Sequence, residues 1–380
     1  MKKMLSAVMA LTIVLGSLPL AYADAETEHT ITEEPMSNQE VIYDLSLAEA
    51  IEMAFADNER LLANEQKQLA AEISIDSAYL SRKPYKKMVI NVTSNFELYC
   101  LKEGYYIKTA QMSQRLAIAE AEKIRSSISY GVTEAYYNLV LMKKLTNAAQ
   151  NAVNLAKTNK IIVDEQYSLG LLSALDYENA SLASILAKSN LDSYVMNEAI
   201  AEENLKILLN IDDKNIRINP TDEIECEEFV SDSSLDAEKA SESRYDLNAL
   251  KESMDLAYEY FDLSSVLTEN SATYNSAYSS YLDAKYNYNY ASKMTKLSVQ
   301  SMYNAILSAK DKMDISEMQY NIKRKEYTAA KLKYELGVIA NVELTKAIND
   351  LYDAQVAYAN AKLTYRMAIE KYKYEITTGL

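Results

Sequence analysis

Glycine and proline are scarce in this sequence. Six glycines and four prolines occur among 380 residues, whereas average proteins contain roughly 7 % glycine and 5 % proline. Because these two residues form most turns, the chain is expected to have few turns and long helices. Tryptophan is absent and phenylalanine occurs four times, so 31 tyrosines supply most of the aromatic surface. Tyrosine suits the seams between helices, where the ring packs while the hydroxyl group reaches water.

Net positive charge is absent and histidine is nearly so, which argues against several functions. The formal net charge is −16, so a nucleic-acid partner is not expected. The single histidine, His29, has no second histidine with which to form a zinc site, and no glycine-rich phosphate loop occurs. The acidic run from Asp222 to Glu228 is interpreted as solvated surface, because it lacks the 12-residue calcium loop with its central glycine. We predict a protein that is not an enzyme and binds no cofactor or metal.

Long apolar runs are missing except at the N-terminus. Lys2 and Lys3 precede an apolar core from Leu5 to Leu20, and a small-x-small site ends at Ala23. This pattern predicts a secretory signal peptide and an exported protein. No later stretch approaches the ~20 apolar residues of a membrane-spanning helix. Only two cysteines occur, Cys100 and Cys226. They are expected to lie too far apart for a disulfide, which requires Cα atoms within about 7 Å.

The sequence contains an internal repeat in two registers. Asn58 to Leu61 matches Arg244 to Leu247 at an offset of 186 in the numbering, whereas "YSLGLLSALDYENA" (167–180) matches "YELGVIANVELTKA" (334–347) at an offset of 167. This many matches in one register indicate internal duplication. The first half is therefore longer than the second by the difference between the offsets (186 − 167 = 19). The natural place of this insertion is the stretch 83–108, where helix periodicity fails.

The composition of this stretch leaves two alternatives open. Val89–Thr93 and Phe96–Leu101 have the composition of strands, so a short β-hairpin is one interpretation, and an irregular excursion is the other. The helix before it is expected to begin with a capping box, because Ser46 is followed three positions later by Glu49. The tyrosine-rich segment 274–290 is interpreted as half-buried helix packing, with a lumen-lining or distal contact surface as the alternative.

Heptads and glycines predict helical hairpins. After Gly337, two series recur at every seventh position: Leu344, Leu351, Tyr358, Tyr365 and Tyr372, and Ala347, Ala354, Ala361 and Ala368. This is a coiled-coil seam. Upstream, residues 112–169 form a helix-compatible stretch about 80 Å long. Gly170 and Gly337 each end such a stretch, because glycine accepts the left-handed conformation at no steric cost. Asp176 or Asn341 is expected to help to open the next helix.

The predicted fold class is mainly all-α, with duplicated long helical hairpins, coiled-coil packing and at most one short β-hairpin in the first half. The expected organisation is a signal peptide, an acidic mobile leader, a first hairpin repeat, a connecting segment and a second hairpin repeat. The signal peptide occupies residues 1–23 and the leader 24–44. The first repeat occupies residues 45–211, the connecting segment 212–235 and the second repeat 236–380.

Several motifs resemble the TolC-type outer-membrane efflux family. The openings "LAEAIEMAFADNERL" and "ESRYDL" resemble that family's Asn-Pro-x-Leu and Arg-Pro-Asp-Leu starts without their prolines, "LKILLNI" resembles its half-repeat ending, and the two glycine turns resemble its most specific motif. The resemblance covers about residues 45–379. It implies an exported homotrimer in the periplasm and outer membrane, whose hairpins form a tunnel that works with a periplasmic adaptor protein and an inner-membrane pump.

The resemblance also assigns roles to residues. It implies that the adaptor docks at Leu169, Gly170, Leu171, Leu336, Gly337 and Val338, and that Asp176, Glu343 and Lys346 lie at the closed aperture. Because Lys346 replaces an acid there, a ring of these side chains would pair charges rather than focus a negative field.

The chain departs from the family at its distal end. With one β-hairpin per chain, a trimer would have about six strands. Even a barrel of about eight strands has an interior that side chains fill. An open outer-membrane pore does not follow, and contact of this end with the outer membrane or envelope is left open.

Two functions remain: a conduit component of a tripartite efflux or type I secretion system, or a non-conducting structural or tethering coiled coil of the cell envelope. The first predicts a trimer, and the second a monomer or indefinite assembly.

Overall fold

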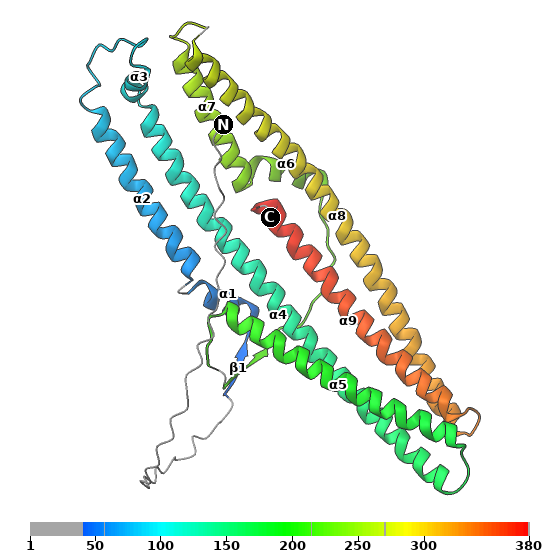
Figure 1. The fold of residues 1–380 in the computed structure, drawn as a ribbon. Helices are drawn as coiled ribbons and strands as arrows, with labels where there is room; N and C mark the ends of the chain where they lie inside the picture. Colours follow the sequence, from blue (N-terminus) through cyan, green and yellow to red (C-terminus); the bar gives the residue numbers. More distant parts are fainter. Residues whose placement is uncertain (1–40, 57, 214, 270, 379–380) are drawn as a thin grey trace, which may run out of the picture. The chain divides into compact units, whose positions relative to one another are not determined.

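The computed structural model describes residues 41–56, 58–213, 215–269 and 271–378. The predicted signal peptide, His29 and the leader before residue 41 lie outside this range. Figure 1 shows long helices in two hairpins, and the described elements occur in the following order. They are β1 (Val41–Leu45), α1 (Leu47–Phe55), α2 (Glu59–Arg82), α3 (Phe96–Glu103), α4 (Tyr105–Ser168), α5 (Ala174–Leu208), β2 (Ile216–Pro220), α6 (Ser233–Ser243), α7 (Tyr245–Ser264), α8 (Ala272–Glu335) and α9 (Asn341–Thr377).

The duplication is visible in the helix boundaries. The starts of α1 and α6, at Leu47 and Ser233, are offset by 186 in the numbering, as are the starts of α2 and α7. The starts of α4 and α8 are offset by 167, as are those of α5 and α9. Helices α4 and α8 each have 64 residues. The two predicted registers are confirmed, and the insertion of the first half falls between the starts of α2 and α4.

Helix starts follow the capping chemistry of the sequence. Ser46 caps α1, and the predicted capping box is confirmed: the Glu49 N–H donates to Ser46 Oγ, and the Glu49 carboxylate accepts from the Ser46 N–H at 2.9 Å. Asn58 caps α2 through its Oδ1. Such caps satisfy N–H groups that have no partner within the helix.

The strand interpretation of residues 96–101 is wrong. These residues belong to α3, in which Phe96 and Cys100 are buried on one helical face. A strand would place Leu98 on that same face, but Leu98 is only half-buried. The composition favoured a strand, but packing against Tyr260, whose ring lies 5.5 Å from that of Phe96, stabilises the helix. Residues 83–95 form turns and irregular structure.

The strands lie where none was predicted. β1 comes from the acidic leader and β2 from the connecting segment, and the two pair in parallel with Val41 opposite Ile216. Nearly half of the chain lies between the two strands, so no local pattern signals their pairing. Asp222, after β2, accepts a hydrogen bond from the Leu47 N–H at 2.6 Å and so ties the connecting segment to the start of α1.

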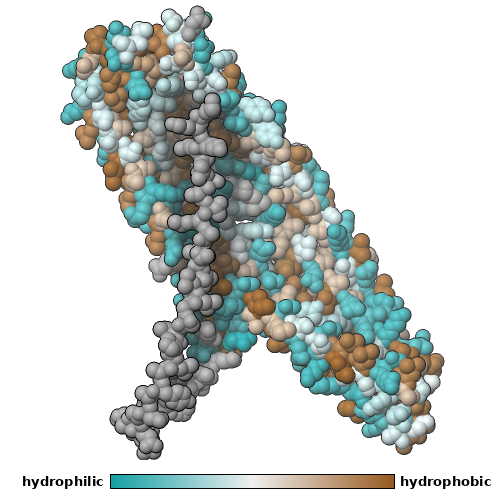
Figure 2. All heavy atoms as spheres, viewed as in Figure 1, coloured by the Kyte–Doolittle hydropathy of each residue, from teal (hydrophilic) through white to brown (hydrophobic). Residues whose placement is uncertain are grey.

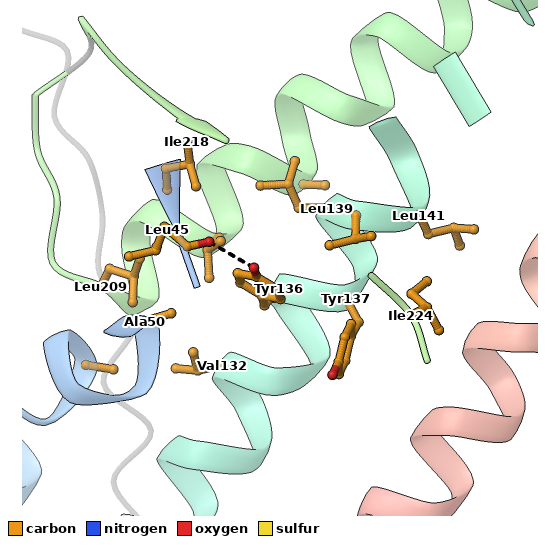
Figure 3. Close-up of a cluster of buried hydrophobic side chains, with 14 of the residues drawn as sticks. Leu45, Ala50, Val132, Tyr136, Tyr137, Leu139, Leu141, Leu209, Ile218 and Ile224 are labelled. Carbon is orange, nitrogen blue, oxygen red and sulfur yellow. Dashed lines mark hydrogen bonds between the residues drawn. The ribbon is translucent and has the colours of Figure 1, made fainter. Parts of the chain in front are cut away.

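A first core gathers around this strand pair. Figure 3 shows Tyr136 of α4 pointing toward Leu45, whose carbonyl oxygen accepts a hydrogen bond from the tyrosine hydroxyl at 2.9 Å. Tyr136 is fully buried, and its hydroxyl also accepts from the Asp222 N–H. The surrounding apolar side chains come from α1, α4, α5 and both strands: Leu45, Ala50, Val132, Leu139, Leu205, Leu209 and Ile218.

A second core lies among α6, α8 and α9. Tyr365 and Tyr372 from the predicted heptad series are buried there beside Val299 and Ile306 of α8. Their hydroxyl groups donate to the Glu227 carbonyl oxygen at 3.1 Å and to Asp236 at 2.8 Å. The tyrosines therefore pack their rings and bond their hydroxyls. The heptad seam is confirmed, with its alanine series half-buried.

Candidate functional site

The two glycine turns share one backbone design. Gly170 and Gly337 both have φ of 70°, in the left-handed region. At the first turn the Leu171 N–H donates to the Gln166 carbonyl oxygen at 2.9 Å, and at the second the Val338 N–H donates to that of Lys333 at 2.9 Å. The glycine N–H in each case bonds the carbonyl oxygen three positions back. Both turns are thus Schellman motifs that satisfy the last carbonyl groups of α4 and α8.

Four apolar side chains flank these glycines and face solvent. Leu169 and Leu171 are 72 % and 71 % exposed, and Leu336 and Val338 are 69 % exposed each. We call residues 169–171 tip 1 and residues 336–338 tip 2. Figure 2 shows hydrophobic spheres among hydrophilic ones at this end of the two hairpins. Exposed apolar groups that recur at the same position of two repeats are typical of a contact surface.

Tip 1 is stabilised by residues of its own hairpin. Ser173 caps α5: its Oγ accepts from the Asp176 N–H at 3.2 Å and donates to the Asp176 carboxylate at 2.7 Å. The ring of Tyr167 stacks on that of Tyr177 with centroids 4.6 Å apart, and the Lys160 ammonium lies 4.5 Å from the centroid of Tyr177. A hydrogen bond to Asp164 raises the pKa of Lys160. The prediction that Asp176 helps to open the helix is confirmed, with Ser173 as the capping residue.

Tip 2 has no such cap. Ala340 occupies the position before α9 and makes no side-chain hydrogen bond to the helix. Asn341, the other residue expected to help to open a helix, is the first residue of α9, and its side chain is buried rather than placed as a cap. The side chain turns into the protein because Asn159 of α4 offers it a partner on both amide atoms.

A polar cluster links tip 2 to the first hairpin. The amide groups of Asn159 and Asn341 bond each other reciprocally, at 3.1 Å and 2.5 Å, and both residues are buried. Asn159 also donates to Thr345 Oγ1 at 3.1 Å. The Tyr334 hydroxyl accepts from Asn341 and donates to Gln166 of α4 at 3.2 Å. The cluster thus joins α4 to both helices of the second hairpin.

Sequence reasoning missed this cluster. Polar residues within an otherwise helical pattern have no local signature that distinguishes a buried pair from a solvated face. One signal was present in the repeat: at the offset of 167, Asn341 corresponds to Ala174, so an amide replaces a methyl group at the same point of the second turn.

The three residues assigned to the aperture lie just beyond the tips. Asp176 is half-buried and bonded to Ser173, whereas Glu343 and Lys346 are exposed in the first turns of α9. Within the described part of the chain, no ion pair joins Glu343 to Lys346. Lys323 and Asp350, one turn further along, form an ion pair at 3.0 Å between α8 and α9.

Two free thiols and no metal-binding cluster occur in the described part of the chain. Cys100 and Cys226 are free thiols, as predicted, and burial raises the pKa of Cys100 to about 11. Among the residues that the structure describes, no cluster of histidine, cysteine or carboxylate side chains could hold a metal ion. Nor does any described helix contain a segment apolar and long enough to cross a membrane.

Comparisons with known proteins point to one family. Residues 241–371 match the family described as outer membrane efflux protein, and no curated relative matches the chain. A membrane protein from Pseudomonas aeruginosa has a similar structure, with a TM-score of 0.72 and 13 % identity over 90 % of this chain and 92 % of that one. The Campylobacter jejuni CmeC outer membrane channel is also similar, with a TM-score of 0.67 and 16 % identity over 88 % of this chain and 86 % of that one.

The outer membrane protein VceC from Vibrio cholerae is similar to the same extent. Its TM-score is 0.69 at 13 % identity, over 88 % of this chain and 96 % of VceC. At such low identity these structures show a shared fold. The mainly α-helical, duplicated hairpin fold predicted from the sequence is confirmed.

Proposed function

We propose that the chain is a TolC-type outer membrane efflux protein, as its family match over residues 241–371 and its fold support, and that its two hairpin tips dock an extracytoplasmic adaptor protein. In this role the chain is a transport conduit rather than an enzyme, which the family match supports. In the proposed role it acts in the cell envelope as part of a tripartite efflux or type I secretion system, with an inner-membrane pump as the third component.

The observation that supports docking is the repeated exposure of apolar side chains at the two tips. A leucine and another branched aliphatic residue flank each glycine, and all four side chains are between 69 % and 72 % exposed. The left-handed glycine fixes the direction of each turn, so the two tips present the same shape. A partner that buries such a pair gains roughly 1.5–3 kcal/mol per side chain from the removal of apolar surface from water.

A homotrimer would multiply this surface. The middle of α9, residues 349–364, contains no fully buried residue among its described side chains, although its heptad series continues through it. Seam positions left half-covered within one chain are available to a neighbouring chain. Three chains would place six tips at one end of the assembly.

The first test measures mass in solution and docking together. Light scattering of the purified mature chain is expected to give three times the monomer mass. Val338→Asp should then reduce binding to the cell's own adaptor at least tenfold, since an apolar contact is replaced by a charge. Val230→Asp is the matched control, because Val230 is 86 % exposed and distant from the tips in sequence.

Two results would contradict the proposal. A detergent-independent monomer that binds no adaptor would favour the structural or tethering function. Equal adaptor binding by the Val338→Asp and Val230→Asp variants, both at wild-type mass, would remove the tips from the docking surface even if the trimer is present.

A further inference from the structure

A basic run lies at the end of α2 in an otherwise acidic chain. It contributes four positive charges: Arg82, Lys83, Lys86 and Lys87. No acidic residue occurs between Asp76 and Glu97. Residues 82–108 contain six cations and two acids, a local net charge of +4, whereas the whole chain has a formal net charge of −16. The overall charge therefore conceals one region of opposite sign.

The lysines of this run are free to meet a partner. Lys83, Lys86 and Lys87 are exposed, and within the described ranges none of them has an ion pair. Arg82 differs, because it is half-buried and its Nε donates to the Lys102 carbonyl oxygen at 2.8 Å. Arg82 thus anchors the end of α2 to α3, and the three lysines remain unpaired beyond it.

Apolar residues follow the lysines directly. The loop of residues 83–95, which we call the α2–α3 loop, begins with two turns in which the Tyr85 N–H donates to the Arg82 carbonyl oxygen and the Met88 N–H to that of Tyr85, both at 3.0 Å. Val89, next in the chain, is 99 % exposed, and Met88 is exposed as well. A fully exposed valine beside lysines has no packing role within this chain.

The α2–α3 loop lies far from the tips. It precedes the start of α4, whose 64 residues span roughly 95 Å before tip 1, and Figure 1 shows it at the opposite end of the first hairpin. The connection between α7 and α8 reaches the same end, where Phe96 packs against Tyr260. That connection also exposes a valine, Val266, although Asp262 and Glu269 near it are acidic.

We propose that the α2–α3 loop binds an anionic lipid surface. Lys83, Lys86 and Lys87 contact the headgroups, while Met88 and Val89 enter the boundary between headgroups and acyl chains. This interaction is peripheral and does not depend on adaptor docking or on conduction. It gives the end opposite the tips a defined contact of its own.

The neighbouring apolar residues favour lipid over a soluble polyanion. The combination of unpaired lysines with exposed apolar residues matches the membrane interface, where each basic residue gains from anionic lipid and each apolar group gains from the acyl boundary. A soluble polyanion would use the lysines alone and leave Val89 in water.

The absence of tryptophan allows a site-specific test. Val89→Trp introduces a unique indole at the proposed contact, and Val230→Trp introduces one at a similarly exposed valine among acids in the connecting segment. With vesicles of phosphatidylcholine and phosphatidylglycerol, the emission of the Val89→Trp variant should shift to the blue and be quenched by brominated lipid. The Val230→Trp variant should show neither change.

A charge test complements the fluorescence. Combined replacement of Lys83, Lys86 and Lys87 by Gln should weaken vesicle binding roughly 100-fold, because each lysine contributes a similar share of the free energy of binding to an anionic surface. The matched control replaces three exposed lysines of α8 by Gln: Lys325, Lys331 and Lys333. This variant loses the same charge and should bind vesicles as the unaltered protein does. Equal binding by the two triple variants would overturn the proposal. So would equal binding to pure phosphatidylcholine, or binding of dextran sulfate without any vesicle-induced shift of the Val89→Trp emission.

Discussion

At tip 1 the turn is stabilised by neighbours in its own hairpin, whereas at tip 2 the same turn depends on the other hairpin. Tip 1 has the Ser173 cap and the stacked rings of Tyr167 and Tyr177. Tip 2 lacks a cap and has instead the buried pair of Asn159 and Asn341. The backbone of the two turns is nearly the same, so the difference lies in the side chains.

The comparison shows how a duplicated unit becomes specialised. A local cap lowers the free energy of one helix end without a partner from another hairpin. The buried amide pair stabilises tip 2 only while α4 lies beside α9, because Asn159 and Asn341 lose their bonds to each other when the helices separate. The second hairpin is thereby held in register with the first, whose tip has its local cap and stacked rings in addition.

The largest expected effect comes from breaking the amide pair. Asn159→Ala removes two hydrogen bonds from the buried Asn341 amide, which keeps Tyr334 and Thr345 as partners. Each lost hydrogen bond costs about 0.5–1.5 kcal/mol. Hydrogen exchange should show faster opening of residues 336–348 and little change at residues 168–180. Local opening free energies of this kind are resolved segment by segment.

A double replacement separates the pair from its surroundings. Asn159→Leu combined with Asn341→Leu removes both polar groups and keeps the same number of side-chain heavy atoms. The double variant should regain most of the stability that Asn159→Ala loses, because removal of both partners of a hydrogen bond is nearly neutral. Equal acceleration of exchange at both tips after Asn159→Ala would contradict the proposed dependence of tip 2 alone on the other hairpin.

The next effect should be the same at both tips. Gly170→Ala and Gly337→Ala each place a Cβ atom on a residue with φ of 70°, which costs about 1–2 kcal/mol for a residue with a side chain. Neither position has a heavy atom within 4 Å of the added Cβ, so the cost comes from the backbone. Urea unfolding of each variant measures it.

Gly131 provides the matched control for these two variants. It lies within α4 and a Cβ atom added there also meets nothing within 4 Å. Gly131→Ala should therefore stabilise the protein by about 0.5–1 kcal/mol, because alanine has the higher helix propensity. A stabilising effect of Gly170→Ala or Gly337→Ala would show that the left-handed turn is not maintained.

The features that were predictable from the sequence depend on residues close together in the chain. The glycine turns, the Ser46 capping box and the heptad tyrosines each follow from short, regular spacings. The two repeat registers located the insertion of the first half between the starts of α2 and α4, because the two halves can be compared directly.

The features that were not predictable depend on distant partners. β1 pairs with β2 although nearly half of the chain lies between them, and the pairing turns part of an acidic leader into a strand. Residues 96–101 have the composition of a strand and form a helix, because Phe96 and Cys100 pack on one face. Asn341 sits where a cap was expected, yet Asn159, from the first hairpin, determines its role.

The smallest expected effect transfers the cap from tip 1 to tip 2. Ala340 has φ and ψ of −76° and 158°, close to the −73° and 155° of Ser173, so a serine at position 340 can accept from the Glu343 N–H as Ser173 does from Asp176. Ala340→Ser should stabilise the start of α9 by about 1 kcal/mol, and Ser173→Ala should destabilise α5 by the same amount. Hydrogen exchange of the first turn of each helix measures both effects. With Asn159→Ala in the background, Ala340→Ser should still stabilise α9 without restoring its contact with α4, because a cap acts within one helix and the amide pair acts between two.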